Sequence, residues 1–471
     1  MMRSLRSLVP FLALSPFVSA QTTWYVDDNG PFDPFPGVSV PGNPIFSDPA
    51  EDGSASNPFD DLWKAVAAAS SGDEIVVLPS DVAGAYFLSG AIDVGGKDLV
   101  IRSRDGAAVT VLDGTSIPGQ HGVSYDEEET SASLLEGFTF RSFNQGTSGS
   151  DVGGAIEIRD SHPTIRKCVF EGNVAYIGAA ILTSDSSSRI EDCVFSGNDS
   201  AHQGGAVYTT DGDVHIVRCT FEGNVANYAG ALLTRTTSGG AITVLDSTFV
   251  NNSSRIGYAG AFAKFDGGTA LVDRCVFLQN VADDSGGGAY LSGGTNTVRN
   301  SLFNANTALT GEGAMTGTSS GVHLVVGCTF HGNAGGGVAE DGSASLTLRN
   351  SIVWNNAPFE IESGVDVQRT NVLGGYAGDN LDVDPVFVDA DGPDNLAGTL
   401  DDDFSLFAGS PCIDAGDTTF VAVGYPLDLL RRSRAVDVPS VADQGTAMLG
   451  LTVDLGAFEF QSGLAPQRFR R

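Results

Sequence analysis

Hydrophobic and polar positions alternate in short runs through the middle of the chain, and this arrangement recurs about every 26 residues. Each run ends on a Phe, and an Asn follows three residues later. The signature occurs at Phe170/Asn173, Phe195/Asn198, Phe221/Asn224, Phe249/Asn252, Phe277/Asn280, Phe303/Asn306 and Phe330/Asn333, with a weaker copy at Val353/Asn356. A fixed period of this size predicts one structural unit stacked on itself, which is a solenoid.

A second series of small residues keeps the same period. Gly-Ala steps precede a short apolar run in each unit, at Gly154-Ala155, Gly178-Ala179, Gly205-Ala206, Gly230-Ala231, Gly260-Ala261, Gly288-Ala289 and Gly313-Ala314. Gly at a repeated position predicts a corner that needs a positive φ or a close backbone approach. We expect the Asn of the first series to form a ladder at a turn, where its amide bonds to the backbone and to the next Asn.

The runs before each Phe, such as residues 165–170 and 214–221, have the period of a β-strand. Short strands separated by Gly, Asn, Asp and Ser, with no helical period between them, predict an all-β parallel β-helix. Each unit is then one coil, and each run is expected to be one strand whose Phe faces the core. Equivalent residues of neighbouring coils would lie directly above one another.

The two ends of the chain depart from the repeat. Residues 59–69 have a helical period with Leu62, Val66 and Ala69 on one face, which predicts a short helix capping the open end of the coil stack. From about Asp379 the chain is rich in Asp, and the signature is absent. The predicted organisation is a signal peptide at residues 1–20, an N-terminal strand, loop and capping helix at 21–72, the β-helix at 73–376, an acidic C-terminal module at 377–460 and a basic tail at 461–471.

The first residues predict export, because Arg3 and Arg6 precede an apolar stretch at 8–18 and the small residues Val18-Ser19-Ala20. The rest of the chain has no apolar segment long enough to span a bilayer as a helix. The net charge of −33 disfavours a nucleic-acid partner and favours the binding of divalent cations. We therefore expect a secreted protein, located outside the cell, in the periplasm or at the cell surface.

The six cysteines follow the repeat. Five of them stand two residues before the signature residue of their unit, at Cys168, Cys193, Cys219, Cys275 and Cys328, and Cys412 lies apart in the C-terminal region. Although export permits disulfides, Ser247 and Ser301 take the same position in other units. The position thus accepts any small side chain, which predicts buried thiols without bridges.

The Asp-rich stretch after the repeats contains the candidate metal ligands. Calcium takes six to eight oxygen ligands, and carboxylates alternate here around Gly392. The candidate ligands are Asp389, Asp391, Asp394, Asp401, Asp402 and Asp403. The stretch departs from the EF-hand loop, because Pro393 stands where an oxygen ligand is expected and no Glu closes the loop. Calcium is therefore the candidate cofactor, and a plain acidic loop is the alternative.

Taken together, these motifs resemble known families. The alternating Phe-x-x-Asn and Gly-Gly-Ala-Ile motifs, over roughly residues 134–356, resemble the repeats of the polymorphic outer membrane proteins within the pectin-lyase-like right-handed β-helix superfamily. Residues 24–27, 72–77, 410–417 and 454–459 are similar to secreted bacterial β-helix proteins with a choice-of-anchor type of C-terminal domain. The resemblance implies a right-handed coil. Its members include lyases, hydrolases, epimerases, adhesins and inert stalks, so it does not choose an activity.

The motifs that would mark an enzyme of this superfamily are absent. We find neither the Arg-x-Pro-x-x-Arg pattern of pectate lyases nor the Asn-Thr-Asp and Gly-His-Gly motifs of polygalacturonases. No catalytic residue is therefore assigned. The favoured hypothesis is a non-catalytic secreted or surface protein whose solenoid face binds an extracellular polysaccharide or a surface protein. The alternative is a polysaccharide lyase or glycoside hydrolase, and a third hypothesis is a structural stalk.

Overall fold

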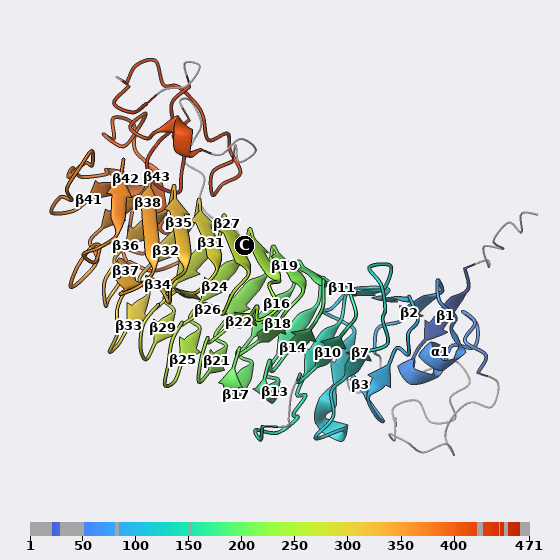
Figure 1. Cartoon of the computed structure of the whole chain (residues 1–471). Helices are drawn as coiled ribbons and strands as arrows, with labels where there is room; N and C mark the ends of the chain where they lie inside the picture. Colours follow the sequence, from blue (N-terminus) through green and yellow to red (C-terminus); the bar gives the residue numbers. More distant parts are fainter. Residues whose placement is uncertain are drawn as a thin grey trace, which may run out of the picture.

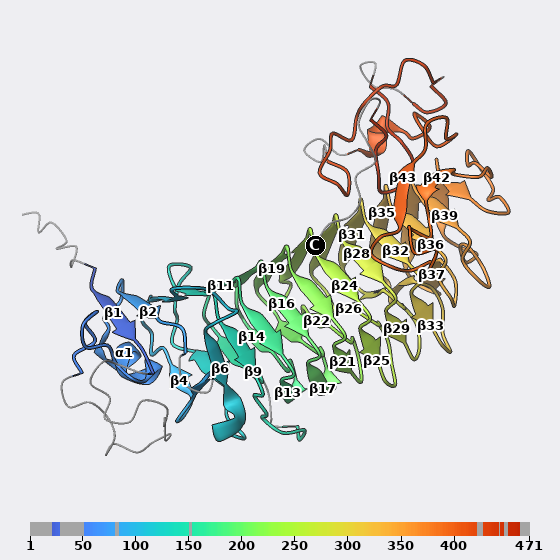
Figure 2. The ribbon, with the colours of Figure 1, turned by 180° about the vertical axis from the view of Figure 1, so that it is seen from behind.

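The computed structural model describes residues 21–28, 51–80, 84–149, 153–421, 427–441, 443–446 and 451–461. The predicted signal peptide and nearly all of the predicted basic tail lie outside the described residues. The chain forms an elongated parallel β-helix whose coils follow one another from the N-terminal end, with the C-terminal module against one side (Figures 1 and 2). The predicted fold class is confirmed.

Four parallel sheets of the described residues build the coils. Sheet I is formed by β1 (Thr23–Val26), β2 (Glu74–Val77), β5 (Val100–Ser103), β8 (Leu134–Glu136), β11 (Thr164–Arg166), β15 (Arg189–Glu191), β19 (Asp213–Val217), β23 (Ala241–Leu245), β27 (Thr269–Asp273), β31 (Thr295–Arg299), β35 (Val322–Val326), β38 (Ser345–Arg349) and β40 (Asp366–Gln368). Sheet II is formed by β4 (Ile92–Asp93), β7 (Val123–Tyr125), β10 (Ile156–Arg159), β14 (Ile181–Ser184), β18 (Val207–Thr210), β22 (Leu232–Arg235), β26 (Phe262–Phe265), β30 (Ala289–Ser292), β34 (Met315–Thr318) and β37 (Val338–Asp341).

The other two sheets complete each coil. Sheet III is formed by β3 (Tyr86–Phe87), β6 (Val111–Asp113), β9 (Thr139–Arg141), β12 (Val169–Glu171), β16 (Val194–Ser196), β20 (Thr220–Glu222), β24 (Thr248–Val250), β28 (Val276–Leu278), β32 (Leu302–Asn304), β36 (Thr329–His331), β39 (Ile352–Trp354) and β41 (Asn371–Val372). Sheet IV is formed by β13 (Val174–Ile177), β17 (Asp199–Gln203), β21 (Val225–Ala226), β25 (Ser253–Ser254), β29 (Val281–Ala282) and β33 (Thr307–Ala308). The chain visits sheets II, I, III and IV in that order in each repeat.

The sequence predicts that each run before a signature Phe is one strand. This prediction is wrong, because each run is divided between two strands. Residues 164–171 form β11 and β12, which belong to sheets I and III. Lys167 stands between them in the left-handed region with φ of 52°, and Arg218 has the same role in its coil with φ of 54°. One left-handed residue bends the chain and resets the alternation, so that Ile165 and Phe170 both face the core.

The repeated Phe residues form a stack in the core. Neighbouring ring centroids from Phe140 to Phe330 are 4.5 to 5.1 Å apart and the rings are nearly parallel. All of these rings are fully buried. The spacing follows that of parallel strands, so one aromatic position per coil gives a continuous dry core.

The predicted Asn ladder is present beside this stack. From Asn173 to Asn356, each Nδ2 donates to Oδ1 of the next Asn at 2.7 to 3.1 Å. In the middle of the ladder, Asn252 Nδ2 also donates to the Phe221 carbonyl at 2.9 Å. At the C-terminal end, Glu360 replaces the next Asn and accepts from Asn356 Nδ2 at 2.6 Å. The buried amides are thus satisfied along the whole ladder.

The Gly-Ala corners behave as expected. Gly204 has φ of 62°, and a Cβ on Gly205 would lie 1.8 Å from the Gly230 carbonyl oxygen. The first position therefore needs a left-handed residue and the second allows no side chain. All six cysteines are buried and free, as predicted.

A short helix covers the N-terminal end of the core. Asp61 is the N-cap of helix α1 (Leu62–Ala68), and its side chain accepts a hydrogen bond from the Trp63 backbone N–H. Leu62 and Val66 are buried in the same core cluster as the first coils. The predicted capping helix is therefore present.

The C-terminal module packs along the side of the solenoid. Its regular elements within the described residues are the antiparallel pair β42 (Phe387–Asp389) and β43 (Asp403–Leu406), and the short 3₁₀ helix η2 (Thr418–Phe420). A second 3₁₀ helix, η1 (Gly114–Ser116), lies in the early coils of the solenoid and not in the module. Phe404, Leu429 and Phe458 share an apolar cluster with the outward side chains of β28 and β32. The module thus rests on the outer face of sheet III.

His331 of β36 takes part in this contact. Its ring centroid lies 4.9 Å from that of Phe404 and 5.9 Å from that of Phe387. Burial lowers the pKa of His331 to about 4, so the imidazole is neutral between the two rings. Asn355 lies 3.3 Å from its Nε2 atom.

Replacing Asn252 with Ala tests the ladder. The change removes four hydrogen bonds, to Phe221, Asn224 and Asn280, and leaves buried partners unsatisfied. We expect the free energy of unfolding to fall by roughly 3 kcal/mol, measured by urea denaturation. Asn227→Ala in the preceding coil is the control, because Asn227 is half-buried and outside the ladder. Equal losses in the two variants would contradict a specific role of the ladder.

The His331 contact predicts a pH dependence. Because the folded pKa lies below the ordinary value of 6.5, this residue stabilises the fold above about pH 6.5 and loses that contribution as the pH falls toward 4. A His331→Phe variant lacks this term, so its stability relative to wild type should rise by up to about 3 kcal/mol between pH 7 and pH 4. Urea denaturation of both proteins at each pH measures the difference. A pH-independent difference would contradict a buried neutral His331.

Candidate binding groove

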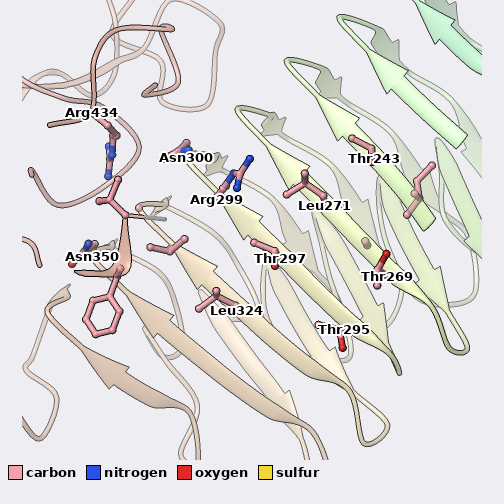
Figure 3. Close-up of a pocket in the computed structure, with 16 residues that line it drawn as sticks. Thr243, Thr269, Leu271, Thr295, Thr297, Arg299, Asn300, Leu324, Asn350 and Arg434 are labelled. Atoms are coloured by element: carbon pink, nitrogen blue, oxygen red, sulfur yellow. The ribbon is translucent and has the colours of Figure 1, made fainter. Parts of the chain in front are cut away.

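A groove of about 320 Å³ lies where the C-terminal module meets the outer face of sheet I (Figure 3). Its lining residues come from four neighbouring strands, β23, β27, β31 and β35, and from the module. It runs along the solenoid axis, across the strands. Three strand intervals correspond to a length of about 14 Å.

The floor of the groove is a row of outward side chains in register. Thr243, Leu271, Thr297 and Leu324 occupy equivalent positions in the four strands. Their neighbours along each strand face the core, because side chains alternate in a β-strand. Figure 3 shows this row together with Thr269 and Thr295, which begin the same strands. The floor therefore combines hydroxyl groups with apolar surface.

One wall of the groove is held by buried polar contacts. Asp273 is 1 % exposed and accepts from Arg299 Nη2 and from Asn300 Nδ2, both at 3.0 Å. In the next coils, the side chain of Asn350 bonds both the backbone N–H and the carbonyl of Asp417 in the module, at 2.8 and 2.9 Å. The same contacts thus fix the wall and dock the module.

Arg434 contributes the buried cation of this wall. It is 2 % exposed, its Nη2 donates to the Asp454 carbonyl at 3.4 Å, and its Nη1 has no hydrogen-bond partner among the described residues. A Cβ on Gly327 would lie 2.5 Å from Nη2, so glycine makes room for the guanidinium. Arg434 Nε lies 4.0 Å from the Glu459 carboxylate.

The carboxylates near Arg434 are themselves deeply buried. Burial raises the pKa of Asp454 to about 7 and that of Glu459 well above its usual range. Asp428 also interacts electrostatically with this guanidinium, so three acidic groups surround it.

The lining of the groove offers hydrogen-bond donors and apolar surface. The described residues that line it include amide and guanidinium donors, threonine hydroxyls and apolar side chains, and no Asp, Glu, His, Lys or Cys. A guanidinium only donates hydrogen bonds. The arrangement suits an extended ligand rich in oxygen, and it supplies no carboxylate pair of the kind that glycoside hydrolysis needs.

Of the six predicted calcium ligands, Asp389 ends β42, Asp403 begins β43 and the other four lie between the two strands. No three of them, all within the described residues, bring carboxylate oxygens within 4.8 Å of one another. Asp394 accepts from the Leu396 backbone N–H and Asp403 from that of Ser405, each at 2.9 Å, while Asp401 accepts from the Thr399 hydroxyl. Asp389 is half-buried and Asp391 is exposed. The calcium site stays a prediction, and binding requires these side chains to rearrange.

Asp402 has a structural contact instead. It is buried and its Oδ2 accepts from Asn304 Nδ2 of β32 and from the Gly398 backbone N–H, both at 2.7 Å. Burial raises the pKa of this carboxyl group. Asp402 therefore ties the acidic loop to the solenoid.

A different carboxylate group is brought together in the described part of the module. Asp414, Asp437 and Asp443 offer oxygens within 4.8 Å of one another. Asp414 accepts from the Val438 backbone N–H at 3.2 Å and from the Thr452 hydroxyl. Its present contacts hold the fold of the module.

The sequence analysis did not identify the groove. Leu271 and Leu324 carried a signal, since they are apolar at outward strand positions, and Leu324 is 38 % exposed. Arg299, Asn350 and Arg434 had no such signal. Arg299 and Asn350 belong to coils of the solenoid, and only the docking of the module brings Arg434 to them.

The family model described as the right handed beta helix region matches residues 101–277 and 259–375, more than half of the chain. The chain belongs to this right-handed β-helix family. A comparison with curated proteins found no match. In the part of the chain that the structure describes, no helix has the length and apolar character needed to cross a membrane.

Solved structures show distant similarity to the chain. Pectate lyase Pel9A is 15% identical, with 94% of this chain and 98% of the other covered and a TM-score of 0.37. A rhamnogalacturonan lyase is 12% identical, with coverages of 82% and 97% and a TM-score of 0.42. Tailspike protein 3 of bacteriophage CBA120 is 12% identical, with coverages of 72% and 58% and a TM-score of 0.28. These similarities are too distant to assign an activity.

The calcium prediction can be tested on the full chain. Calorimetric titration with calcium should give stoichiometric heat that is lost in Asp391→Ala, because carboxylate oxygens are the expected ligands. Asp382→Ala, which removes an exposed Asp of the same module outside the predicted set, should bind as wild type. If calcium gives no heat of binding with wild type, the calcium site is contradicted and the alternative of a plain acidic loop is favoured.

Proposed function

We propose that the protein is a non-catalytic, secreted or cell-surface β-helix protein that binds carbohydrate in the groove on sheet I. The observation that carries the proposal is the register row Thr243, Leu271, Thr297 and Leu324 beneath a wall of fixed donors. A row of hydroxyl and apolar groups matches the two faces of a sugar ring. The donors of the wall match its oxygens.

The rigidity of the groove supports binding. Its floor belongs to a continuous sheet, and its wall is held by Asp273 and by the Asn350 contacts with Asp417. A preformed site loses little conformational entropy when a ligand binds. The groove also follows the solenoid axis, so it suits a segment of a longer chain molecule.

The location of the protein outside the cell is part of the proposal. The N-terminal sequence pattern supports export, and the excess of carboxylates disfavours nucleic acid. An adhesin or envelope-associated role agrees with the resemblance to polymorphic outer membrane protein repeats and to the choice-of-anchor type of C-terminal domain.

Filling the groove tests the proposal. Thr297→Trp places a large ring on the floor, and it should weaken binding of the preferred oligosaccharide at least about tenfold. Isothermal calorimetry with a panel of acidic and neutral oligosaccharides measures the affinity. Thr164→Trp is the matched control, because Thr164 begins β11 on the same sheet and in the same register row, outside the groove.

Two results would contradict the proposal. One is equal affinity of Thr297→Trp and wild type for every ligand that binds. The other is the release of unsaturated products or new reducing ends during incubation with the panel, which would favour the alternative of a polysaccharide lyase or glycoside hydrolase. We expect intact ligands after incubation. The lining contains no carboxylate pair for hydrolysis, and the proposal assigns no residue as the base of an elimination.

A further inference from the structure

A second surface is built from aromatic side chains that begin on sheet IV, at Tyr176 of β13 and His202 of β17, and end on the outer face of sheet II, at Tyr290 of β30. Tyr176 stacks on His202 with ring centroids 5.0 Å apart, and His202 meets Tyr228 edge-on at 5.7 Å. The row continues through Tyr228 and Tyr258 at 6.4 Å, and Tyr258 stacks on Tyr290 at 4.3 Å. One aromatic ring thus follows another over neighbouring coils.

Tyr228 and Tyr258 of this row form the upper layer of a two-layer surface. Its lower layer is the register row Leu182, Tyr208, Leu233, Ala263 and Tyr290 on the outer face of sheet II. Leu233 and Ala263 are 0 % exposed although they face outward, because Tyr228, Tyr258 and Phe265 pack against them. We call Tyr228, Tyr258 and Phe265 the tyrosine platform.

The upper rings are partly exposed, although Tyr290 covers one face of the Tyr258 ring. Tyr228, Tyr258 and Phe265 are half-buried, and Ile256 beside them is 58 % exposed. Among the described residues, neither the Tyr228 hydroxyl nor the Tyr258 hydroxyl has a hydrogen-bond partner. Gly257 makes room for the Tyr228 ring, since a Cβ there would lie 2.3 Å from Tyr228 Cδ1. The platform therefore presents apolar ring surface together with unused hydroxyl groups.

The charges around the platform are mainly negative. Asp211 and Asp266 act electrostatically on Tyr208, and Asp284 and Asp341 act on Tyr290. Arg235 and Arg255 are cations of this neighbourhood, and they pair with Asp266 at 2.9 Å and with Asp199 at 2.6 Å. A polyanion would be repelled here. An uncharged ligand meets no such barrier.

We propose that the tyrosine platform is a second carbohydrate-binding surface, which takes a neutral polysaccharide whose pyranose rings lie on Tyr228 and Tyr258. The apolar face of a sugar ring packs on an aromatic face, and its hydroxyl groups reach the free tyrosine hydroxyls. Successive coils advance by about 4.8 Å, close to the advance of an extended β-linked glycan per residue. Since sheets I and II are different faces of the solenoid, one molecule can hold two glycan chains.

The test uses the full chain in affinity electrophoresis through gels that contain a neutral polysaccharide, either hydroxyethylcellulose or galactomannan. Wild type should be retarded, and Tyr258→Ala and Tyr228→Ala should each weaken the interaction about tenfold. Tyr258→Phe keeps the ring and should lose much less. Thr164→Trp, outside both the groove and the tyrosine platform, should be retarded as wild type. Thr297→Trp reports on the groove separately, so that failure of the groove and failure of the platform are distinguished.

Thermal unfolding of each variant, followed by circular dichroism, verifies that the solenoid is folded. Phe265→Ala serves as an additional platform variant if Tyr258→Ala does not fold. The proposal is overturned if no neutral polysaccharide retards wild type, or if the folded platform variants migrate as wild type does. Retardation that is lost only in Thr297→Trp would place the binding in the groove. A protein that binds the platform more tightly than any glycan would also overturn it.

Discussion

Stacking of identical positions in successive coils is the constraint on which the rest of the structure depends. The Asn ladder and the Phe stack repeat at the spacing of parallel strands, so each coil is held by the one before and the one after it. Because amides and rings are satisfied inside the solenoid, its outer faces are free to vary. The features with binding chemistry lie on those outer faces.

The C-terminal module turns one of these faces into a groove. Asn350, Asp402 and His331 are contact points between module and solenoid, and none of them belongs to the stacked core positions. The sheet supplies a flat floor, and the docked module supplies a wall that contains Arg434. On sheet II, aromatic residues build a surface without any added module.

The architecture could be predicted from the sequence because the repeated residues act locally. The period identified the solenoid, and the small positions identified the corners and the buried thiols. The left-handed corner at Lys167 was missed, since a charged residue there gives no sign of a positive φ. The groove was missed for a different reason. Arg299 and Arg434 are far apart in the chain, and no periodic signal connects them.

A crystal structure of the protein soaked with the oligosaccharide that binds most tightly is the most direct test of the central claim. The account predicts an intact sugar chain along the solenoid axis, lying over Thr297 and Leu324 and bonded to the wall that contains Asn300. A cleaved product in the groove, or an empty groove with the sugar bound elsewhere on the protein, would contradict it.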